Sequence, residues 1–342
     1  MKQIIDLRSD TLTKPGKAML DYMSSCPVGD DVFSEDPTVN RLEQYAANLF
    51  GHEAAIFCPS GTMTNQIAIK IHTRPGDEVI CDTTAHVYNY EGGGIAVNSG
   101  ASTRLLPGKF GQFTAEDVAQ NINPDNIHHP VSKLVVIENT SNKGGGSIWN
   151  INEIKKIKAV CQQNDLKLHM DGARLFNALV ETGEKPHEYG NIFDSISICL
   201  SKGLGAPVGS LLIGNAAFIK QARRVRKVLG GGMRQAGYLA GAGIYALENN
   251  ISRLKEDHNR ARILAQELAS LSYVDKVLPV STNIVIFKLT EQISDHLFIK
   301  RMDEQGIKLV GFGPQTIRMV THLYYNDQML EQTINILKNF SI

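Results

Sequence analysis

The stretch that decides the fold is Asp194-Ser195-Ile196-Ser197-Ile198-Cys199-Leu200-Ser201-Lys202-Gly203-Leu204-Gly205. Residues 195–200 form a short apolar run with β-branched side chains, which is typical of a buried strand, and glycines follow it. Lys202 therefore stands at the tip of a predicted strand. Removal from water disfavours the ammonium form of such a lysine and leaves a nucleophilic amine. From this run alone, a lysine that leaves the strand for solvent is the more common case.

A second strand changes the interpretation. In the run Leu166–Arg174, Leu166, Leu168 and Met170 alternate like one face of a strand, and Asp171 ends it. The 31 residues from Asp171 to Lys202 leave room for a crossover helix between two parallel strands. An aspartate and a lysine at the same sheet edge suit pyridoxal phosphate, because the amine binds its carbonyl and the carboxylate keeps its ring nitrogen protonated.

Strand-like and helical runs alternate along the chain between Glu78 and Ile213. This alternation predicts an α/β fold, with a mostly parallel central sheet covered by helices on both faces. A helix is expected over Pro37–Phe50, with Gly51 as its stop. The tail reads as a smaller C-terminal α+β unit, so we expect a large domain over residues 1–250 and a small one over 251–342.

Five separated motifs resemble those of one family, the low-specificity L-threonine aldolases. These motifs are Asp6–Thr11, Pro27–Val32, His169–Arg174, Leu200–Gly205 and Gly230–Gln235. The resemblance runs from about Asp6 to the last helix. It implies a pyridoxal-phosphate enzyme of the aspartate-aminotransferase-like fold (fold type I), with Lys202 as Schiff-base lysine and Asp171 opposite the ring nitrogen. The expected reaction is retro-aldol cleavage of L-threonine or L-allo-threonine to glycine and acetaldehyde, as in threonine degradation or glycine biosynthesis.

The resemblance also assigns cofactor-binding residues. Ser60, Gly61 and Thr62 precede a predicted helix, whose N-terminal N–H groups suit the cofactor phosphate, although an ordinary N-cap fits the same residues. His86 falls where the family stacks a histidine on the cofactor ring; a lone loop histidine satisfied by its neighbours is the alternative. Arg174 is implied to contact the ring's 3-oxygen and the substrate carboxylate.

Two further groups are implied to hold the substrate or the cofactor. Arg318 lies among apolar residues of a predicted strand, where a charge needs a partner; a structural salt bridge and a substrate carboxylate both fit. The family interpretation adds Ser9 as a second carboxylate ligand. Arg234 matches a loop that reaches the cofactor phosphate of a neighbouring subunit, so a shared active site in a homotetramer is expected.

The sequence departs from the family at Ser141, where a histidine is usual. The proton acceptor for the substrate hydroxyl is then His86 or His128. His129 beside His128 leaves the second assignment open by one position.

Composition excludes several classes of partner. The 35 Lys+Arg balance the 35 Asp+Glu, which argues against nucleic acid or an anionic membrane as the main partner. No apolar run approaches the ~20 residues that span a bilayer. The first six residues have no apolar signal core, and the cysteines are odd in number without C-x-x-C spacing, so a cytoplasmic enzyme is expected.

Other activities remain as alternatives. β-Elimination, transamination and phenylserine-type substrates use the same residues on the same fold. Gly203–Gly209 approaches a dinucleotide fingerprint, but its third glycine comes one residue late, so an NAD-dependent oxidoreductase is remote. A metal-dependent aldolase would draw on His86, His128, His169 and Asp171, which lack any recognised ligand pattern; no metal is expected.

Overall fold

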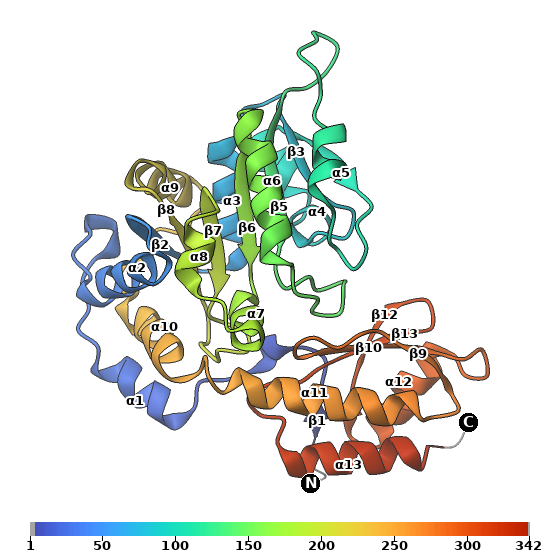
Figure 1. Ribbon diagram of the computed structural model, residues 1–342. Helices are drawn as coiled ribbons and strands as arrows, with labels where there is room; N and C mark the ends of the chain where they lie inside the picture. The colour runs from blue at the N-terminus through green and yellow to red at the C-terminus, as the bar shows by residue number, and fades with distance from the viewer. Residues whose placement is uncertain (1–3, 341–342) are drawn as a thin grey trace.

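A seven-stranded sheet forms the centre of the larger part of the molecule (Figure 1). The computed structural model describes residues 4–340. The strands follow the order β2 (Ala54–Cys58), β8 (Ser210–Gly214), β7 (Ser195–Cys199), β6 (Lys167–Gly172), β5 (Ser132–Glu138), β3 (Glu78–Asp82) and β4 (Ser102–Leu106). Only β8 runs against the others among these strands, pairing antiparallel with both β2 and β7. The predicted mostly parallel sheet is therefore confirmed.

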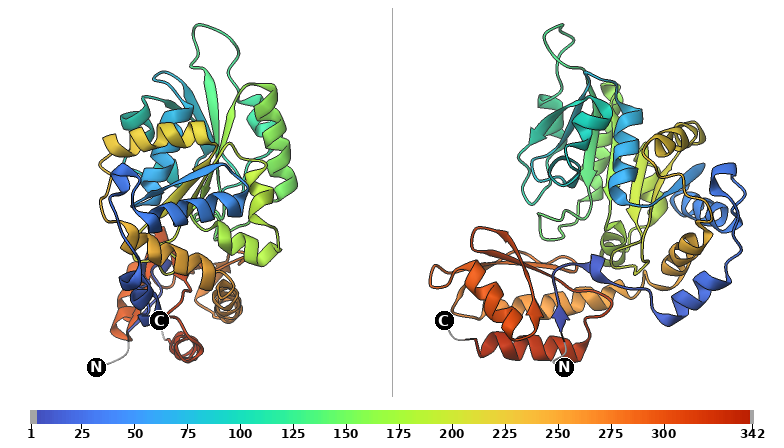
Figure 2. Two further views of the ribbon diagram at one scale, coloured as in Figure 1. Left: turned by 90° about the vertical axis from the view of Figure 1, so that its left-hand side faces the viewer. Right: turned by 180° about the vertical axis from the view of Figure 1, so that it is seen from behind.

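Helices cover both faces of this sheet (Figure 2). Their bounds are α1 Lys17–Ser25, α2 Pro37–Phe50, α3 Gly61–His72, α4 His86–Asn89, α5 Ala115–Gln120, α6 Ile151–Gln163, α7 Leu175–Thr182, α8 Pro186–Gly190, α9 Ala216–Val228 and α10 Gly237–Asn249. Helix α2 confirms its predicted bounds: Asp36 caps its first turn, Pro37 begins it, and Gly51 ends it at φ +70°. Short single turns lie at Asp10–Leu12, Asp31–Phe33 and Ile95–Ser99.

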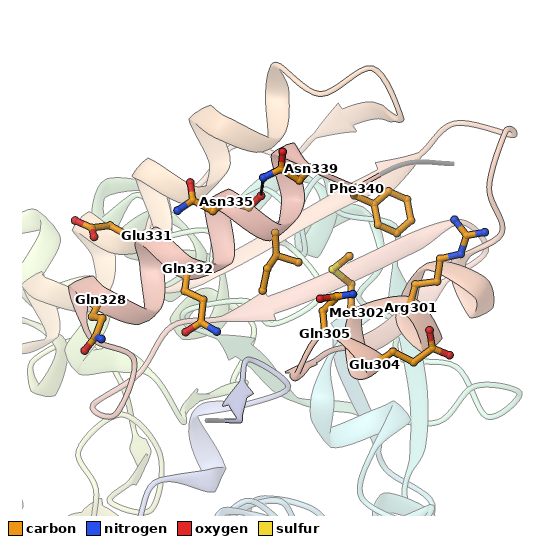
Figure 3. Close-up of a pocket in the computed structure, with 11 residues that line it drawn as sticks. Arg301, Met302, Glu304, Gln305, Gln328, Glu331, Gln332, Asn335, Asn339 and Phe340 are labelled. Carbon is orange, nitrogen blue, oxygen red and sulfur yellow. Dashed lines mark hydrogen bonds between the residues drawn. The ribbon is translucent and has the colours of Figure 1, made fainter. Parts of the chain in front are cut away.

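The C-terminal unit is a four-stranded antiparallel sheet backed by helices. Its sheet order is β12 (Val310–Gly313), β13 (Thr316–Val320), β10 (Ile284–Leu289) and β9 (Val274–Val277), and its helices are α11 (Leu254–Ala269), α12 (Asp295–Glu304) and α13 (Asp327–Lys338). A cavity of about 830 Å³ lies between α12 and α13, far in the fold from the strand ends of the large sheet, and polar side chains dominate it (Figure 3).

The N-terminal strand belongs physically to this second unit. Strand β1 (Ile5–Asp6) pairs in parallel with β11 (Ile307–Lys308), and Ile5 packs in the same apolar cluster as Phe298 and Leu264. The chain then crosses to the large unit through Asp10–Leu12. The domain boundary near residue 250 stays a prediction. Strand β1 comes from the N-terminal end of the chain but packs with the C-terminal unit.

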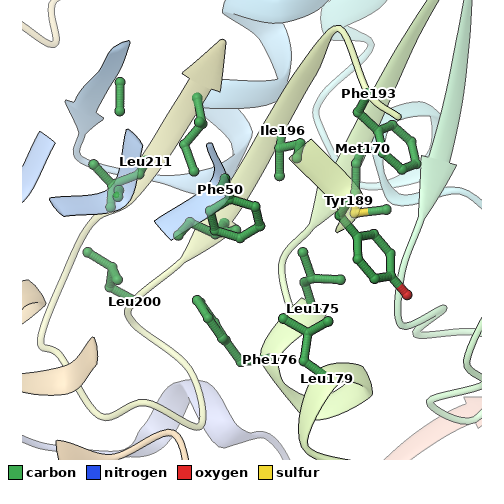
Figure 4. Close-up of a cluster of buried hydrophobic side chains, with 14 of the residues drawn as sticks. Phe50, Met170, Leu175, Phe176, Leu179, Tyr189, Phe193, Ile196, Leu200 and Leu211 are labelled. Atoms are coloured by element: carbon green, nitrogen blue, oxygen red, sulfur yellow. The ribbon is translucent and has the colours of Figure 1, made fainter. Parts of the chain in front are cut away.

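The main core follows the alternation of strand residues. Phe57, Leu211 and Ile213 face the cluster with α2, while Ile56 and Leu212 face a second cluster with α3 and α9. Figure 4 shows the first cluster, in which Phe50, Phe176 and Tyr189 lie beneath the strands. Because both faces are covered, the strand residues are mostly buried, and the polar ones among them, such as His169 of β6 and Ser197 of β7, are buried too. No helix within residues 4–340 has the length and apolar character needed to cross a membrane.

Candidate active site

The candidate site lies where β5, β6 and β7 end, on the side of the C-terminal unit (Figure 1). The strand register sets Asp171 beside Glu138 of β5 and Ser197 of β7. Lys202 follows β7 by three residues, and its carbonyl accepts a hydrogen bond from Thr13 Oγ1 at 3.0 Å. Within the described residues its Nζ has no hydrogen-bond or ion-pair partner, which leaves the amine free to react.

A buried ion pair stands beside Lys202. Arg174 donates from Nε and Nη2 to both oxygens of Asp10, at 2.8 and 2.7 Å, and Asp10 is fully buried. Burial alone would raise the pKa of Asp10, but the charge and hydrogen bonds of Arg174, helped by the charge of Lys202, hold it well below its usual range. Asp10 thereby takes two of the five guanidinium N–H groups of Arg174, and those that remain on Nη1 and Nη2 can meet another anion.

Arg318 of β13 is a largely buried cation without an acidic partner in residues 4–340. It donates from Nη1 to Asn142 Oδ1 at 2.8 Å and from Nη2 to the carbonyl of Arg8 at 2.9 Å, while Nε has no partner. Burial lowers the pKa of Arg318 to about 10, and the charge of Arg174 acts in the same direction. The salt-bridge alternative is therefore not what these residues form. Ser9, next to Arg8 and partly exposed, accepts from the backbone N–H of Thr11 at 3.2 Å.

His86, at the start of α4, belongs to a polar cluster with Asp171. Its Nδ1 lies 2.9 Å from Glu91 Oε1, and the amide nitrogen of Asn65 donates both to that oxygen, at 2.9 Å, and to Asp171 Oδ2, at 3.0 Å. Burial opposes the charged imidazole, but the hydrogen bond to Glu91 and the charges of the nearby carboxylates outweigh it, so the pKa of His86 is raised. Although His86, Glu91 and Asp171 offer ligand atoms within 4.8 Å of one another, the Asn65 amide already bridges the two carboxylates.

Glu138 is a buried site residue that the sequence argument missed. It ends β5 as Asp171 ends β6, and its two oxygens accept from the backbone N–H groups of His86 and Asn142, both at 2.8 Å. Burial raises the pKa of Glu138 to about 7, and the charge of Asp171 acts in the same direction. The carboxyl thus links α4 to the 139–147 loop and titrates near neutral pH.

Glu138→Gln is expected to remove a pH dependence of stability. The folded-state pKa of about 7 lies above the ordinary 4.5, so stability from this group is complete below pH 4.5 and is lost as the pH rises through 7. The wild-type protein should therefore lose unfolding free energy relative to the variant between these values, by up to ~1.4 kcal/mol per pH unit. Urea unfolding of both cofactor-free proteins across this range measures the difference. Parallel profiles would contradict the assignment.

The N-terminus of α3 supplies backbone donors beside Lys202. Ser60 is the N-cap, with its Oγ accepting from the Met63 N–H at 3.2 Å, and Ser60 and Thr62 are exposed. A Cβ on Gly61 would lie 2.6 Å from Cys199 Sγ, so glycine lets the helix begin directly against β7. The free N–H groups and exposed hydroxyls make a cradle that suits a phosphate.

Gly61→Ala is expected to destabilise the protein by ~1–3 kcal/mol, because Cys199 cannot move away within the core. Chemical denaturation measures the loss. Thr62→Ala, on the exposed side of the same turn, is the matched control and should change stability little. Adding Cys199→Ala to Gly61→Ala should restore part of the loss; no recovery would argue against this contact as the cause.

Two predicted site residues lie apart from this group in the single chain. His128 is exposed in the loop between α5 and β5, which projects from the opposite end of the sheet (Figure 1). Arg234 is half-exposed and donates to Asp30 Oδ2 at 2.8 Å.

Ser141, which replaces the family's usual histidine, is buried and accepts from the Gly144 N–H. Gly203–Gly209 leads into strand β8 rather than a helix, so the dinucleotide alternative lacks its structural context.

The comparisons with known proteins agree with this arrangement. The family model described as beta-eliminating lyase matches residues 6–292. The low specificity L-threonine aldolase of Escherichia coli strain K12 is 44% identical over 96% of this chain and 97% of its own, and that of Saccharomyces cerevisiae is 40% identical over 90% and 80%. A solved Leishmania major threonine aldolase structure superposes with a TM-score of 0.85 over 98% of each chain, at 22% identity. The chain belongs to the beta-eliminating lyase family and, within it, to the low-specificity L-threonine aldolases.

Proposed function

We propose that this protein is a pyridoxal-phosphate-dependent aldehyde-lyase that cleaves L-threonine and L-allo-threonine to glycine and acetaldehyde. The observation that carries the proposal is the free amine of Lys202, which follows β7 where that strand pairs with β6 at Asp171. The cation Arg318 lies near the Asp10–Arg174 pair and forms no salt bridge within residues 4–340. The residues present suit the cofactor: an amine for its carbonyl, a buried carboxylate for its ring nitrogen, and the α3 cradle of Ser60, Gly61 and Thr62 for its phosphate.

The side chains divide the work of binding and orientation. Arg318 and Ser9 bind the substrate carboxylate, with the remaining N–H groups of Arg174 at its side. Binding of the carboxylate fixes the orientation of the substrate's Cα–Cβ bond, which is the bond to be cleaved. Bound pyridoxal phosphate supplies the electron sink for the carbanion left after that bond breaks. Asp171 would meet the ring nitrogen, and His86 would lie beside the ring.

The proton of the substrate's β-hydroxyl needs an acceptor. His86 is the candidate histidine that the same chain brings to the site, and its second ring nitrogen is not engaged by Glu91. His128 takes part only if another copy of the chain brings its loop to this site. Ser141 is too enclosed by Gly111 and Gly144 to replace the family's histidine.

The same reasoning supports a homo-oligomer, which we propose is a tetramer. Arg234 follows a run of glycines, Gly230–Gly232, and pairs with Asp30 in its own chain, and we propose that it serves the cofactor phosphate of a neighbouring subunit. The five cysteines are free and four are buried, which fits a reducing, cytoplasmic setting.

Spectroscopy with product analysis tests the proposal. Purified protein with pyridoxal phosphate should show a visible absorption band and release acetaldehyde from L-threonine and from L-allo-threonine, followed through a coupled reductase. A band with pyruvate or ammonia release but no acetaldehyde would favour β-elimination, and turnover of phenylserine alone would favour larger substrates. The absence of any band would overturn the cofactor assignment.

A further inference from the structure

Asn65 in the second turn of α3 is a buried side chain that no step above uses. It is 2% exposed, and every polar atom of its amide is engaged. The nitrogen donates to Glu91 Oε1 at 2.9 Å and to Asp171 Oδ2 at 3.0 Å, and the oxygen lies 3.2 Å from His169 Nε2. The amide therefore lies between two carboxylates. One is Asp171, which is expected at the cofactor ring nitrogen, and the other is Glu91, which contacts His86.

The direction of these hydrogen bonds is fixed by the carboxylates. An ionised carboxylate only accepts, so the amide nitrogen must face both Asp171 and Glu91, and the amide oxygen must accept from His169. His169 then carries its proton on Nε2, and its Nδ1 accepts from the Ser195 hydroxyl at 2.8 Å. Burial lowers the pKa of His169 to about 4, so the ring is neutral and carries a single proton.

Two carboxylates this close repel each other, and burial removes the water that would otherwise solvate them. The Asn65 amide offers one N–H to each, and donation to a carboxylate favours its ionised form. Glu91 Oε1 receives the amide and His86 Nδ1 together, while Gln66 donates to Glu91 Oε2 at 2.7 Å. Loss of Asn65 would therefore disturb both Asp171 and, through Glu91, His86.

We infer that Asn65 is a positioning residue: its amide donates to Asp171 and to Glu91 and so orients both carboxylates, one toward the place of the cofactor ring nitrogen and the other toward His86. The inference rests on the proposed function for the role of Asp171. The titratable groups that face the pair are His86, Glu138 and His169, and all three are unchanged in the variants below.

Asn65→Leu, which keeps the branched shape and removes the donors, is compared with Thr64→Val. Thr64 is the buried neighbour on α3, and its Oγ1 contacts Ser197 Oγ at 2.6 Å and donates to the Gly61 carbonyl at 2.8 Å, so its variant loses two hydrogen bonds but leaves both carboxylates untouched. For the loaded enzyme, Asn65→Leu should weaken pyridoxal-phosphate binding by ~10–100-fold in equilibrium dialysis and lower kcat more than it raises KM. Thr64→Val should do neither.

A second readout needs no cofactor. In urea unfolding of the cofactor-free proteins, Asn65→Leu should lower the free energy of unfolding only slightly at pH 4 and more strongly toward pH 8. The reason is that only ionised carboxylates need the two N–H donors. The loss caused by Thr64→Val should be the same at each pH. A pH-independent loss in both variants, with equal cofactor affinity, would overturn the inference. Failure of the wild-type protein to bind pyridoxal phosphate would overturn the proposed function instead, and the unfolding comparison would still decide the role of Asn65.

Discussion

Lys202→Ala is expected to abolish the visible absorption that pyridoxal phosphate produces in the protein and to lower acetaldehyde release by ~10³-fold or more. Lys202 has no hydrogen-bond or ion-pair partner for its Nζ within residues 4–340, so removing the amine breaks no structural contact of that atom. Alanine at this position should therefore leave the protein folded, at the cost only of the favourable charge interaction between Lys202 and Asp10. The loss would report chemistry and not misfolding.

Two controls separate these effects. Lys17→Ala, at an exposed lysine that pairs only with Asp21 on α1, should keep both the absorption and the activity. Thermal unfolding of Lys202→Ala should match the cofactor-free wild-type protein, because the bound cofactor stabilises only the protein that holds it. Retained visible absorption in Lys202→Ala would show that another amine carries the cofactor, and the assignment of Lys202 would fail.

Much of the arrangement was predictable because it depends on local patterns. The apolar runs before Asp171 and Lys202, and the 31 residues between them, predicted two neighbouring parallel strands, and the structure has them as β6 and β7. Both ends of helix α2 were predictable from local residues, its start from Pro37 after the N-cap Asp36 and its end from Gly51. Strands β2 and β4 were missed: β2 is a five-residue run ending at Cys58-Pro59, and β4 carries partly exposed polar side chains at the sheet edge.

The remaining site residues needed tertiary information. Asp10 meets Arg174 across 164 positions of sequence, and nothing local to either residue predicts that pair. The contact of Arg318 with Asn142 likewise joins the two units. A signal did exist for two residues. Glu138 follows an apolar run just as Asp171 does, and Asn65 comes just before the apolar residues Ile67–Ile69 of α3, where a buried polar side chain requires buried partners.

Asp171→Asn is expected to lower kcat/KM by on the order of 10³-fold while leaving the fold intact. Asp171 accepts from the Ala173 N–H at Oδ1 and from Asn65 at Oδ2, so both oxygens face donors on the protein side. An asparagine can offer an acceptor to only one of them, and its amide N–H₂ would face the other donor. It also lacks the charge that keeps the cofactor's ring nitrogen protonated.

The prediction distinguishes charge from packing. Asp171→Asn keeps the volume, so its unfolding free energy without cofactor should fall by ~1–3 kcal/mol, the cost of one unsatisfied buried donor. Activity near the wild-type level in Asp171→Asn would show that the charge of the carboxylate at position 171 is not needed for the reaction.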